Sequence, residues 1–146
     1  MRVNIKLTEK GAVLPKLGSE KAAGTDLYAN LTTDGLSIAP GETVMVSTGV
    51  AVAIPDGYAG LVYARSGIAC KRGLAPANKV GVIDSDYTGT IYVALHNHSQ
   101  QVQRIENHER IAQLVITPIM QPDWHIVDEL DNTARGAGGF GSSGTN

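Results

Sequence analysis

The chain has 146 residues, 42% of them hydrophobic, and a formal net charge of −2, which is typical of one globular domain of ordinary size. No run of lysine or arginine stands out, so the sequence carries no electrostatic footprint for binding nucleic acid as a polyanion. Cys70 is the only cysteine, which excludes an internal disulfide and fits a reducing compartment; we expect it to be a small packed residue.

The first predicted element is a strand at Val3–Leu7, where polar residues separate the apolar ones. This pattern fits neither a secretory signal nor a membrane span, so we expect a cytoplasmic protein that does not bind a membrane. Further short runs follow between turn signals: Thr43–Val46, Val50–Ile54, Tyr58–Tyr63, Thr90–Leu95, Ile111–Ile116 and His125–Val127. With 17 glycines and six prolines between them, they predict an all-β sandwich, jelly roll or barrel.

One short helical turn is predicted at Ser66–Arg72, with Ser66 as its N-cap and Gly73 at its end. Its free N–H groups would point back toward Arg65-Ser66-Gly67. A guanidinium, a hydroxyl and a glycine at a helix start form a recurring way to hold phosphate, although the tripeptide alone is a weak signal.

The segment Asn78–Gly89 predicts a strand, a tight turn and a second strand, a β-hairpin with Asp84, Asp86 and Tyr87 at the bend. The backbone at the mouth of such a hairpin could bind the edge of a base, and Asn78 could add an amide with both donor and acceptor. The alternative is that the aspartates only form the turn, and the same alternative applies to Asp26 in Ala23-Gly24-Thr25-Asp26-Leu27.

The tail from Arg135 to Gly144 sets the only phenylalanine, Phe140, among glycines. Such a segment cannot pack a core, but arginine suits a phosphate, phenylalanine suits a flat ring and glycine lets backbone N–H groups approach an anion. We interpret the tail as a lid for a nucleotide, joined by a linker at Asp128–Ala134; a frayed C-terminus is the alternative.

Two further features are singled out on residue type. His96 and His98 lie two apart on one strand face, a geometry that could hold zinc. No cysteine or third histidine is near in sequence. The alternative is that the two histidines lie on an edge strand or contact a neighbouring subunit. Trp124 is expected to anchor the last strand or to contact a neighbouring subunit.

Five motifs, taken in order, resemble those of the trimeric dUTP diphosphatases (dUTPases). They are Ala23-Gly24-Thr25-Asp26-Leu27, Arg65-Ser66-Gly67, Gly81-Val82-Ile83-Asp84-Ser85-Asp86-Tyr87-Thr88-Gly89, Arg110-Ile111-Ala112-Gln113-Leu114 and Arg135-Gly136-Ala137-Gly138-Gly139-Phe140-Gly141-Ser142. The resemblance implies a β-clip or jelly-roll-like domain over residues 1–134 with one short helical turn, and a glycine-rich lid over residues 135–146. It also implies a homotrimer in which all three subunits build each active site.

The resemblance further implies a reaction. Asp84 aligns with the carboxylate that activates a water for attack on the α-phosphorus of dUTP, giving dUMP and pyrophosphate. This activity limits uracil incorporation into DNA and supplies dUMP for thymidylate synthesis. Asp26 aligns with a carboxylate that contacts Mg²⁺, the implied cofactor, through water.

The remaining matched positions are implied to bind substrate. Tyr87 resembles the residue that packs under the deoxyribose, and Phe140 the ring that stacks on uracil. The others are Arg65, Ser66, Gly67 and Gln113 for the phosphate chain, Asn78, Gly81, Val82 and Ile83 for uracil, and Arg135, Gly141, Ser142 and Ser143 in the lid.

The chain departs from the family pattern at Ala64, where proline is common, at His108, where glycine is common, and at Ser143, where threonine is common. Two other functions stay open. A dCTP deaminase would share the fold but would call for a glutamate acting on the pyrimidine and a longer chain. From a different class, the chain could be a trimeric binding or regulatory module, since some proteins of this fold also engage partner proteins.

Overall fold

The structure, a computed structural model, describes residues 1–139, and the all-β expectation is confirmed there. The strands are β1 (Asn4–Leu7), β2 (Lys16–Leu17), β3 (Thr25–Tyr28), β4 (Gly35–Ile38), β5 (Thr43–Ser47), β6 (Val50–Ala53), β7 (Tyr58–Tyr63), β8 (Leu74–Pro76), β9 (Gly81–Ile83), β10 (Tyr92–Asn97), β11 (Gln103–Glu106) and β12 (Arg110–Pro118). One helix, α1 (Ser66–Arg72), lies between β7 and β8.

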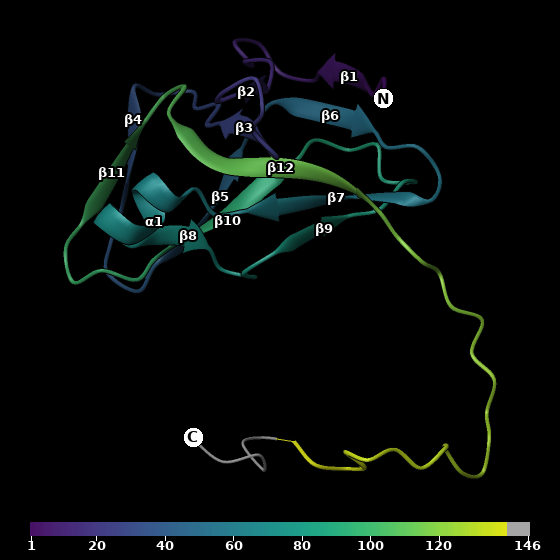
Figure 1. The fold of residues 1–146 in the computed structure, drawn as a ribbon. Helices are drawn as coiled ribbons and strands as arrows, with labels where there is room; N and C mark the ends of the chain where they lie inside the picture. The colour runs from purple at the N-terminus through teal and green to yellow at the C-terminus, as the bar shows by residue number, and fades with distance from the viewer. Residues whose placement is uncertain (140–146) are drawn as a thin grey trace.

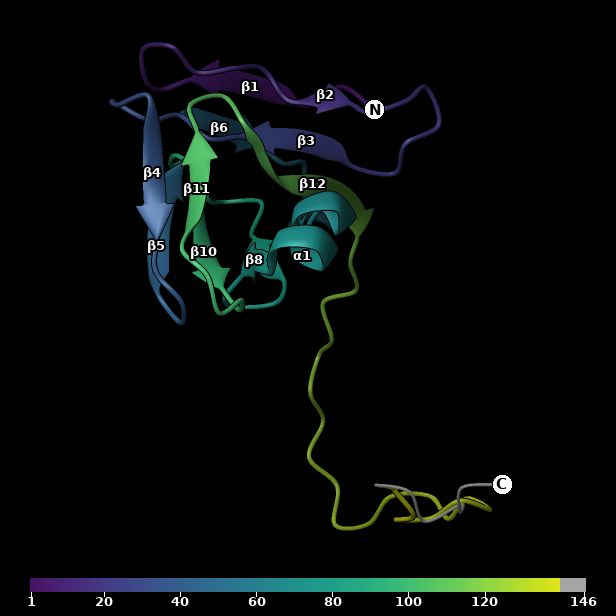
Figure 2. The same ribbon diagram turned by 90° about the vertical axis from the view of Figure 1, so that its left-hand side faces the viewer.

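The strands form antiparallel sheets that wrap around one core (Figures 1 and 2). The largest has the order β2-β3-β12-β7-β9, a second has the order β5-β10-β8, and β1-β6 and β4-β11 form two-stranded pairs. β12 is central because it pairs with β3 on one side and β7 on the other. Segments far apart in sequence therefore meet along this strand.

Alternation of apolar and polar residues directs the strands onto the core. In β10, Val93 and Leu95 are buried, whereas Tyr92, which points to the opposite face of the strand, is exposed. Residues from almost every strand join the core, including Leu27, Ile38, Val46, Val50, Val62, Leu74, Val93, Leu95, Ile105, Ile111 and Leu114. Strand pairing therefore brings residues from many segments together to form the core.

The predicted strand at His125–Val127 is wrong. After β12 the chain runs as an extended arm, residues 119–139, away from the body, and none of its residues pairs with a strand (Figure 1). Trp124, expected as an anchor for a last strand, is 85% exposed. The arm has β-forming residues but no strand edge of its own chain beside it, and β pairing needs such a partner.

The helix was predicted with the right bounds and the wrong cap. Arg65 is the N-cap residue and makes no side-chain capping bond, whereas Ser66 is the first helical residue. Gly73 ends the helix in the left-handed conformation, as predicted. Cys70 is exposed rather than packed, because only Ile68 of this helix is buried.

The predicted β-hairpin at Asn78–Gly89 is also wrong. β9 pairs with β7, whereas the next strand, β10, pairs with β5 and β8 in another sheet and starts two residues later than expected. The short strands that sequence reasoning missed, such as β2 and β11, have two to four residues and little apolar content. No helix in the described part of the chain is long and apolar enough to cross a membrane.

Candidate active site

Asp26 lies at the centre of a cluster of sequence-predicted residues. It is a strand residue of β3, not a turn residue, and is only 7% exposed. Arg65 donates its Nε–H to Oδ1 of Asp26 at 2.6 Å, and Nη1 of Arg110 donates to Oδ2 at 3.3 Å. The carboxylate is therefore held between two guanidinium groups, which offset the cost of burying its charge.

Strand register brings Gln113 to the same place. In β12, Gln113 stands opposite Asp26 of β3 on one side and Tyr63 of β7 on the other. Its Nε2 donates to the carbonyl of Ala64 at 2.8 Å, next to Arg65. Three motifs that are up to 87 residues apart in sequence thus meet through two adjacent strand pairings.

A β-bulge explains how Arg110 also reaches Asp26. Residues three apart on a regular strand point to opposite faces, but the register of β12 shifts between Arg110 and Ala112. Arg110 and Gln113 consequently both lie outside the core, while Ile111 and Ala112 are buried. Arg110 was part of a quoted motif but was not predicted as a site residue, because its role depends on this bulge.

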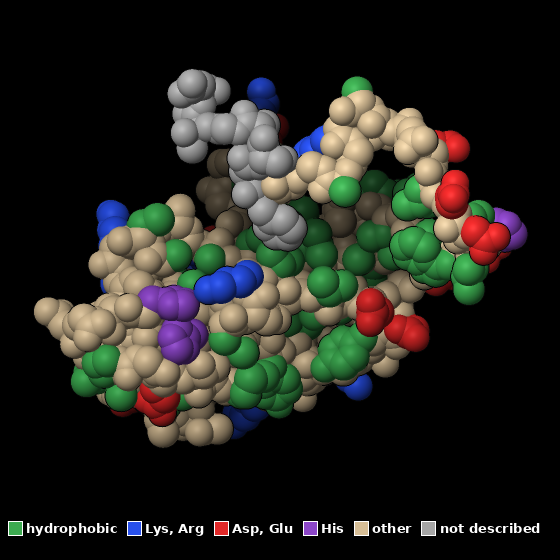
Figure 3. Space-filling view, turned by 90° about the horizontal axis from the view of Figure 1, so that it is seen from below, with side chains coloured by type: hydrophobic (Ala, Val, Ile, Leu, Met, Phe, Trp, Pro, Cys, Tyr) green, Lys and Arg blue, Asp and Glu red, His purple; other side chains and the backbone are tan. Residues whose placement is uncertain are grey.

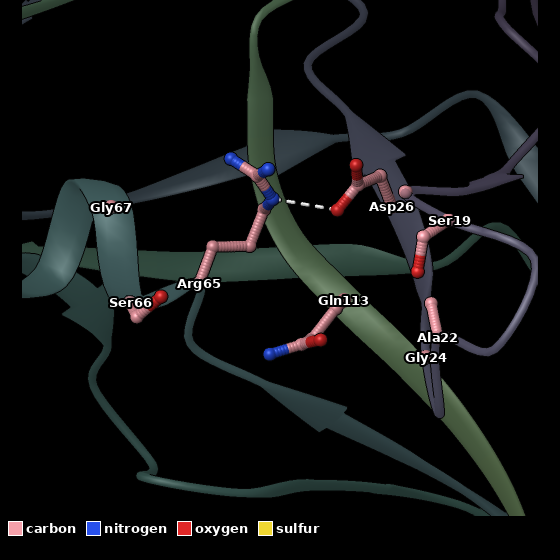
Figure 4. Close-up of a pocket in the computed structure, with 9 residues that line it drawn as sticks. Ser19, Ala22, Gly24, Asp26, Arg65, Ser66, Gly67 and Gln113 are labelled. Carbon is pink, nitrogen blue, oxygen red and sulfur yellow. Dashed lines mark hydrogen bonds and ion pairs between the residues drawn. The ribbon is translucent and has the colours of Figure 1, made fainter.

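Asp26, Arg65 and Gln113 line a cleft of about 230 Å³, which we call the Asp26 cleft (Figure 4). Its lining is Gly18, Ser19, Ala22, Gly24, Asp26, Arg65, Ser66, Gly67 and Gln113. A Cβ on Gly24 would lie 3.0 Å from Oε1 of Gln113, so glycine is needed for this approach, whereas a Cβ on Gly67 would meet nothing within 4 Å. The helix start therefore faces open space in the cleft.

Asp84 and Tyr87 lie in a different hollow. It measures about 300 Å³ and is lined by Met45, Val82, Ile83, Asp84, Tyr87, Ile91 and Tyr92; we call it the Asp84 hollow. The Tyr87 hydroxyl donates to the carbonyl of Thr90 at 2.8 Å, and its backbone N–H donates to the carbonyl of Asp84 at 3.2 Å. These bonds form a turn that fixes the ring in the hollow that Asp84 also lines.

A third, smaller hollow of about 140 Å³ lies where β9 and β10 separate. Its lining is Val62, Pro76, Asn78, Gly81, Val82, Ile83, Tyr92, Val93 and Ala94, so it adjoins the Asp84 hollow. A Cβ on Gly81 would lie 3.3 Å from Nδ2 of Asn78. Because the two strands belong to different sheets, the β9 edge on this side has no strand partner within residues 1–139, which leaves its backbone groups facing the hollow.

The structure thus places the predicted residues in two regions. Asp26, Arg65, Ser66, Gly67 and Gln113 line one cleft, and the segment from Asn78 to Tyr87 lines the other two hollows, with no lining residue shared between these regions. Arg135 lies on the exposed arm and bonds only locally, from Nε to the carbonyl of Gly138 at 2.9 Å. Phe140, Gly141, Ser142 and Ser143 lie outside the described residues.

Met45 and Tyr92 were missed as site residues. They come from β5 and β10 and reach the Asp84 hollow only through the pairing of those two strands. Of the departures from the family pattern, His108 has a φ of 64°, a left-handed conformation that glycine adopts without strain. The structure therefore explains why glycine is common at this position.

The two histidines singled out from the sequence lie close together, on the face of the molecule drawn in Figure 3. His96 lies in β10, the central strand of its sheet, so the edge-strand alternative is wrong. His98 is exposed, and partial desolvation, followed by the charges of His96 and Lys79, lowers its pKa. The part of the chain that the structure describes holds no group of three or more histidine, cysteine, aspartate or glutamate residues that could bind a metal ion.

Comparisons of the chain with family models, curated sequences and solved structures all point to the same family. The dUTPase family model matches residues 10–144. The chain is 51% identical to deoxyuridine 5'-triphosphate nucleotidohydrolase of Escherichia phage T5, over 98% of this chain and 99% of the phage protein, and 46% identical to that of Desulfitobacterium hafniense strain DCB-2, over 93% and 90%. Among solved structures, Staphylococcus bacteriophage 80alpha dUTPase with dUPNHPP superposes with a TM-score of 0.89 at 32% identity, covering 99% of each chain. A mutant dUTPase from phage phi11 of S. aureus, described with a structural Mg(II) ion, gives 0.78 at 26% identity over 88% of this chain and 98% of that chain.

Proposed function

Because the chain belongs to the dUTPase family, we propose that it hydrolyses dUTP to dUMP and pyrophosphate, with Asp84 activating the water that attacks the α-phosphorus. In the cell this reaction would limit uracil incorporation into DNA and supply dUMP for thymidylate synthesis. The observation that carries the proposal is the Asp26 cleft, where Asp26, Arg65 at the start of α1 and Gln113 converge from three separate motifs.

The Asp26 cleft is suited to the phosphate chain. Arg65 uses Nε for Asp26, so its two terminal nitrogens stay available for phosphate oxygens. The hydroxyl of Ser66 and the first N–H groups of α1 add uncharged donors beside it. Asp26 therefore acts here as a positioning residue, since it sets the direction of the guanidinium.

Asp84 fits the part of general base. Its side chain is exposed at the end of β9, so a water molecule can reach it before substrate binds. A positioned carboxylate that takes a proton from the attacking water contributes a factor of about 10²–10⁴ in rate. The Tyr87 ring beside it would pack under the deoxyribose and leave no room for a 2′-hydroxyl.

The hollow between β9 and β10 supports recognition of uracil. Its backbone groups at Gly81–Ile83 and the amide of Asn78 offer both donors and acceptors to a base edge. A snug polar hollow discriminates between bases because a base that leaves a buried donor unpaired loses roughly 1–3 kcal/mol of binding free energy. Thymine and cytosine, which differ from uracil in a methyl and an amino group, would be rejected in this way.

The division of these residues supports a homotrimer with shared active sites. The phosphate-binding and base-binding regions share no lining residue within one chain, and the arm leaves the body with Met120, Trp124 and Ile126 at least 85% exposed. Large exposed apolar residues on an extended segment are stabilised by a partner surface. We propose that the arm crosses to a neighbouring subunit and carries Arg135 and the lid, residues 135–146, to a site there.

Mg²⁺ fits this chain through water rather than directly. Both carboxylate oxygens of Asp26 already accept hydrogen bonds from guanidinium groups, whose positive charges oppose a directly bound cation. Each oxygen retains a lone pair for a metal-bound water, and Mg²⁺ usually keeps several waters and binds substrate phosphates. When bound, the ion would neutralise negative charge on the phosphate chain.

The test is to incubate the purified protein and Mg²⁺ separately with dUTP, dTTP, dCTP and UTP, and to measure both pyrophosphate and ammonia. We expect pyrophosphate from dUTP alone and no ammonia. Ammonia from dCTP would assign the chain to the deaminases instead, and a properly assembled sample that left dUTP intact would refute the proposal.

A further inference from the structure

The side chains of His96 and His98 form a pair whose geometry suits a metal ion. His96 lies in β10 and His98 directly follows the last residue of that strand, and the two imidazole centroids lie 4.3 Å apart with an angle of 63° between the rings. The Nδ1 of His96 is hydrogen-bonded to Oγ1 of Thr43 at 2.8 Å. That bond fixes the ring and leaves Nε2 of His96 directed away from its partner on β5.

This arrangement has the parts of a bidentate nitrogen site. Imidazole suits Zn²⁺, Ni²⁺ and Cu²⁺, and a hydrogen bond to the second ring nitrogen is the usual way to orient a ligating histidine. We propose that His96 and His98 chelate one such borderline divalent ion, separately from any Mg²⁺ that accompanies a nucleotide. Water fills the remaining positions, or the same histidine pair of a neighbouring copy does.

The site lies apart from the hollows that would hold a nucleoside. Tyr92 and Ala94 share the alternating face of β10 with His96, and both line the hollow between β9 and β10. His96 is two residues beyond Ala94, roughly 7 Å along an extended strand, and does not line that hollow. A metal ion on the histidine pair would therefore sit beyond the end of that hollow and take no part in binding the base.

The experiment uses the full chain without a polyhistidine tag, stripped with a chelator, and titrated with Zn²⁺ alone by calorimetry. We expect saturable binding that excess Mg²⁺ does not displace, because Mg²⁺ prefers oxygen ligands. His96→Asn and His98→Asn should each weaken Zn²⁺ binding at least about tenfold. Matched controls are His108→Asn and His125→Asn, which should stay within about twofold of the unsubstituted chain.

Copper supplies a second readout. The hyperfine pattern of bound Cu²⁺ in electron paramagnetic resonance should show at least two nitrogen ligands, and the pattern should be lost in either variant of the pair. The ratio of metal to chain distinguishes the sources of the other ligands: one ion per chain indicates water, and one per two or three chains indicates shared histidines. Both ratios support the site.

Substitution of Lys79 should change Zn²⁺ affinity in the opposite direction to substitution of the histidines. The charge of Lys79 acts on His98, so it also repels a cation bound there. Lys79→Asn should therefore tighten Zn²⁺ binding, and asparagine suits the left-handed backbone of this residue, whose φ is 65°. Weaker binding in this variant, absence of Zn²⁺ binding, or binding that survives loss of both histidines in a folded protein would overturn the proposal.

Discussion

Arg65 and Asp26 are joined by a 2.6 Å hydrogen bond between Nε and Oδ1 that links the N-cap residue of α1 to the middle of β3. The side chains are 22% and 9% exposed, so the pair is largely withdrawn from solvent. A residue singled out for metal contact therefore has a structural task first, which is to orient a guanidinium in the Asp26 cleft (Figure 4).

Asp26→Asn should loosen Arg65 and raise the KM for dUTP by about tenfold, since a neutral amide holds a guanidinium less firmly. It should also lower the free energy of unfolding by about 1–2 kcal/mol at fixed protein concentration, measured in urea. Glu106→Gln is the matched control, because its pair with Arg104 is more than half exposed on both sides and should contribute little. Equal effects of the two substitutions would contradict the positioning role.

Asp84→Asn should reduce the rate of pyrophosphate release by a factor of about 10²–10⁴ while nucleotide binding and assembly persist, because only the proton acceptor is lost. Single-turnover hydrolysis and binding of a non-hydrolysable dUTP analogue separate these quantities. Asp86→Asn is the control from the same turn, since Asp86 is also exposed, and should retain activity. An active Asp84→Asn protein would remove Asp84 from the role of base.

Removing residues 135–146 should lower kcat/KM for dUTP by about tenfold to a hundredfold, through the loss of Arg135 and of stacking by Phe140. The free energy of unfolding should not change, because the core is formed by residues up to Leu114 and the described part of the arm adds nothing to it. Steady-state kinetics and urea denaturation provide the two measurements. Normal turnover would show that the segment is not a lid.

Gly89→Ala should disturb the selection of the sugar. A Cβ at Gly89 would lie 2.7 Å from the Tyr87 hydroxyl oxygen, so we expect the ring to shift and its bond to the Thr90 carbonyl to weaken. We expect the ratio of kcat/KM for dUTP to that for UTP to fall by about tenfold or more. Tyr87→Phe, which keeps the ring and removes only the hydroxyl, should retain most of this ratio, and a larger loss there than in Gly89→Ala would contradict the packing argument.

The sequence by itself determined what depends on local pattern. Tyr58–Tyr63 and Ser66–Arg72 were predicted with their observed bounds, since alternation, turn residues and a terminal glycine act within a few residues. The motifs also predicted the family, because the order of short segments is a property of the chain alone.

Only the tertiary structure decided which segments pair. Those pairings in turn decide which residues meet in the site. β9 and β10 are close in sequence but join different sheets, which opens a hollow where a hairpin was expected. The bulge that directs Arg110 to Asp26 and the register that sets Gln113 beside it arise from contacts more than 80 residues apart. The residues 125–127 failed as a strand for the same reason: a strand is stabilised by hydrogen bonds to a partner, and local propensity cannot supply one.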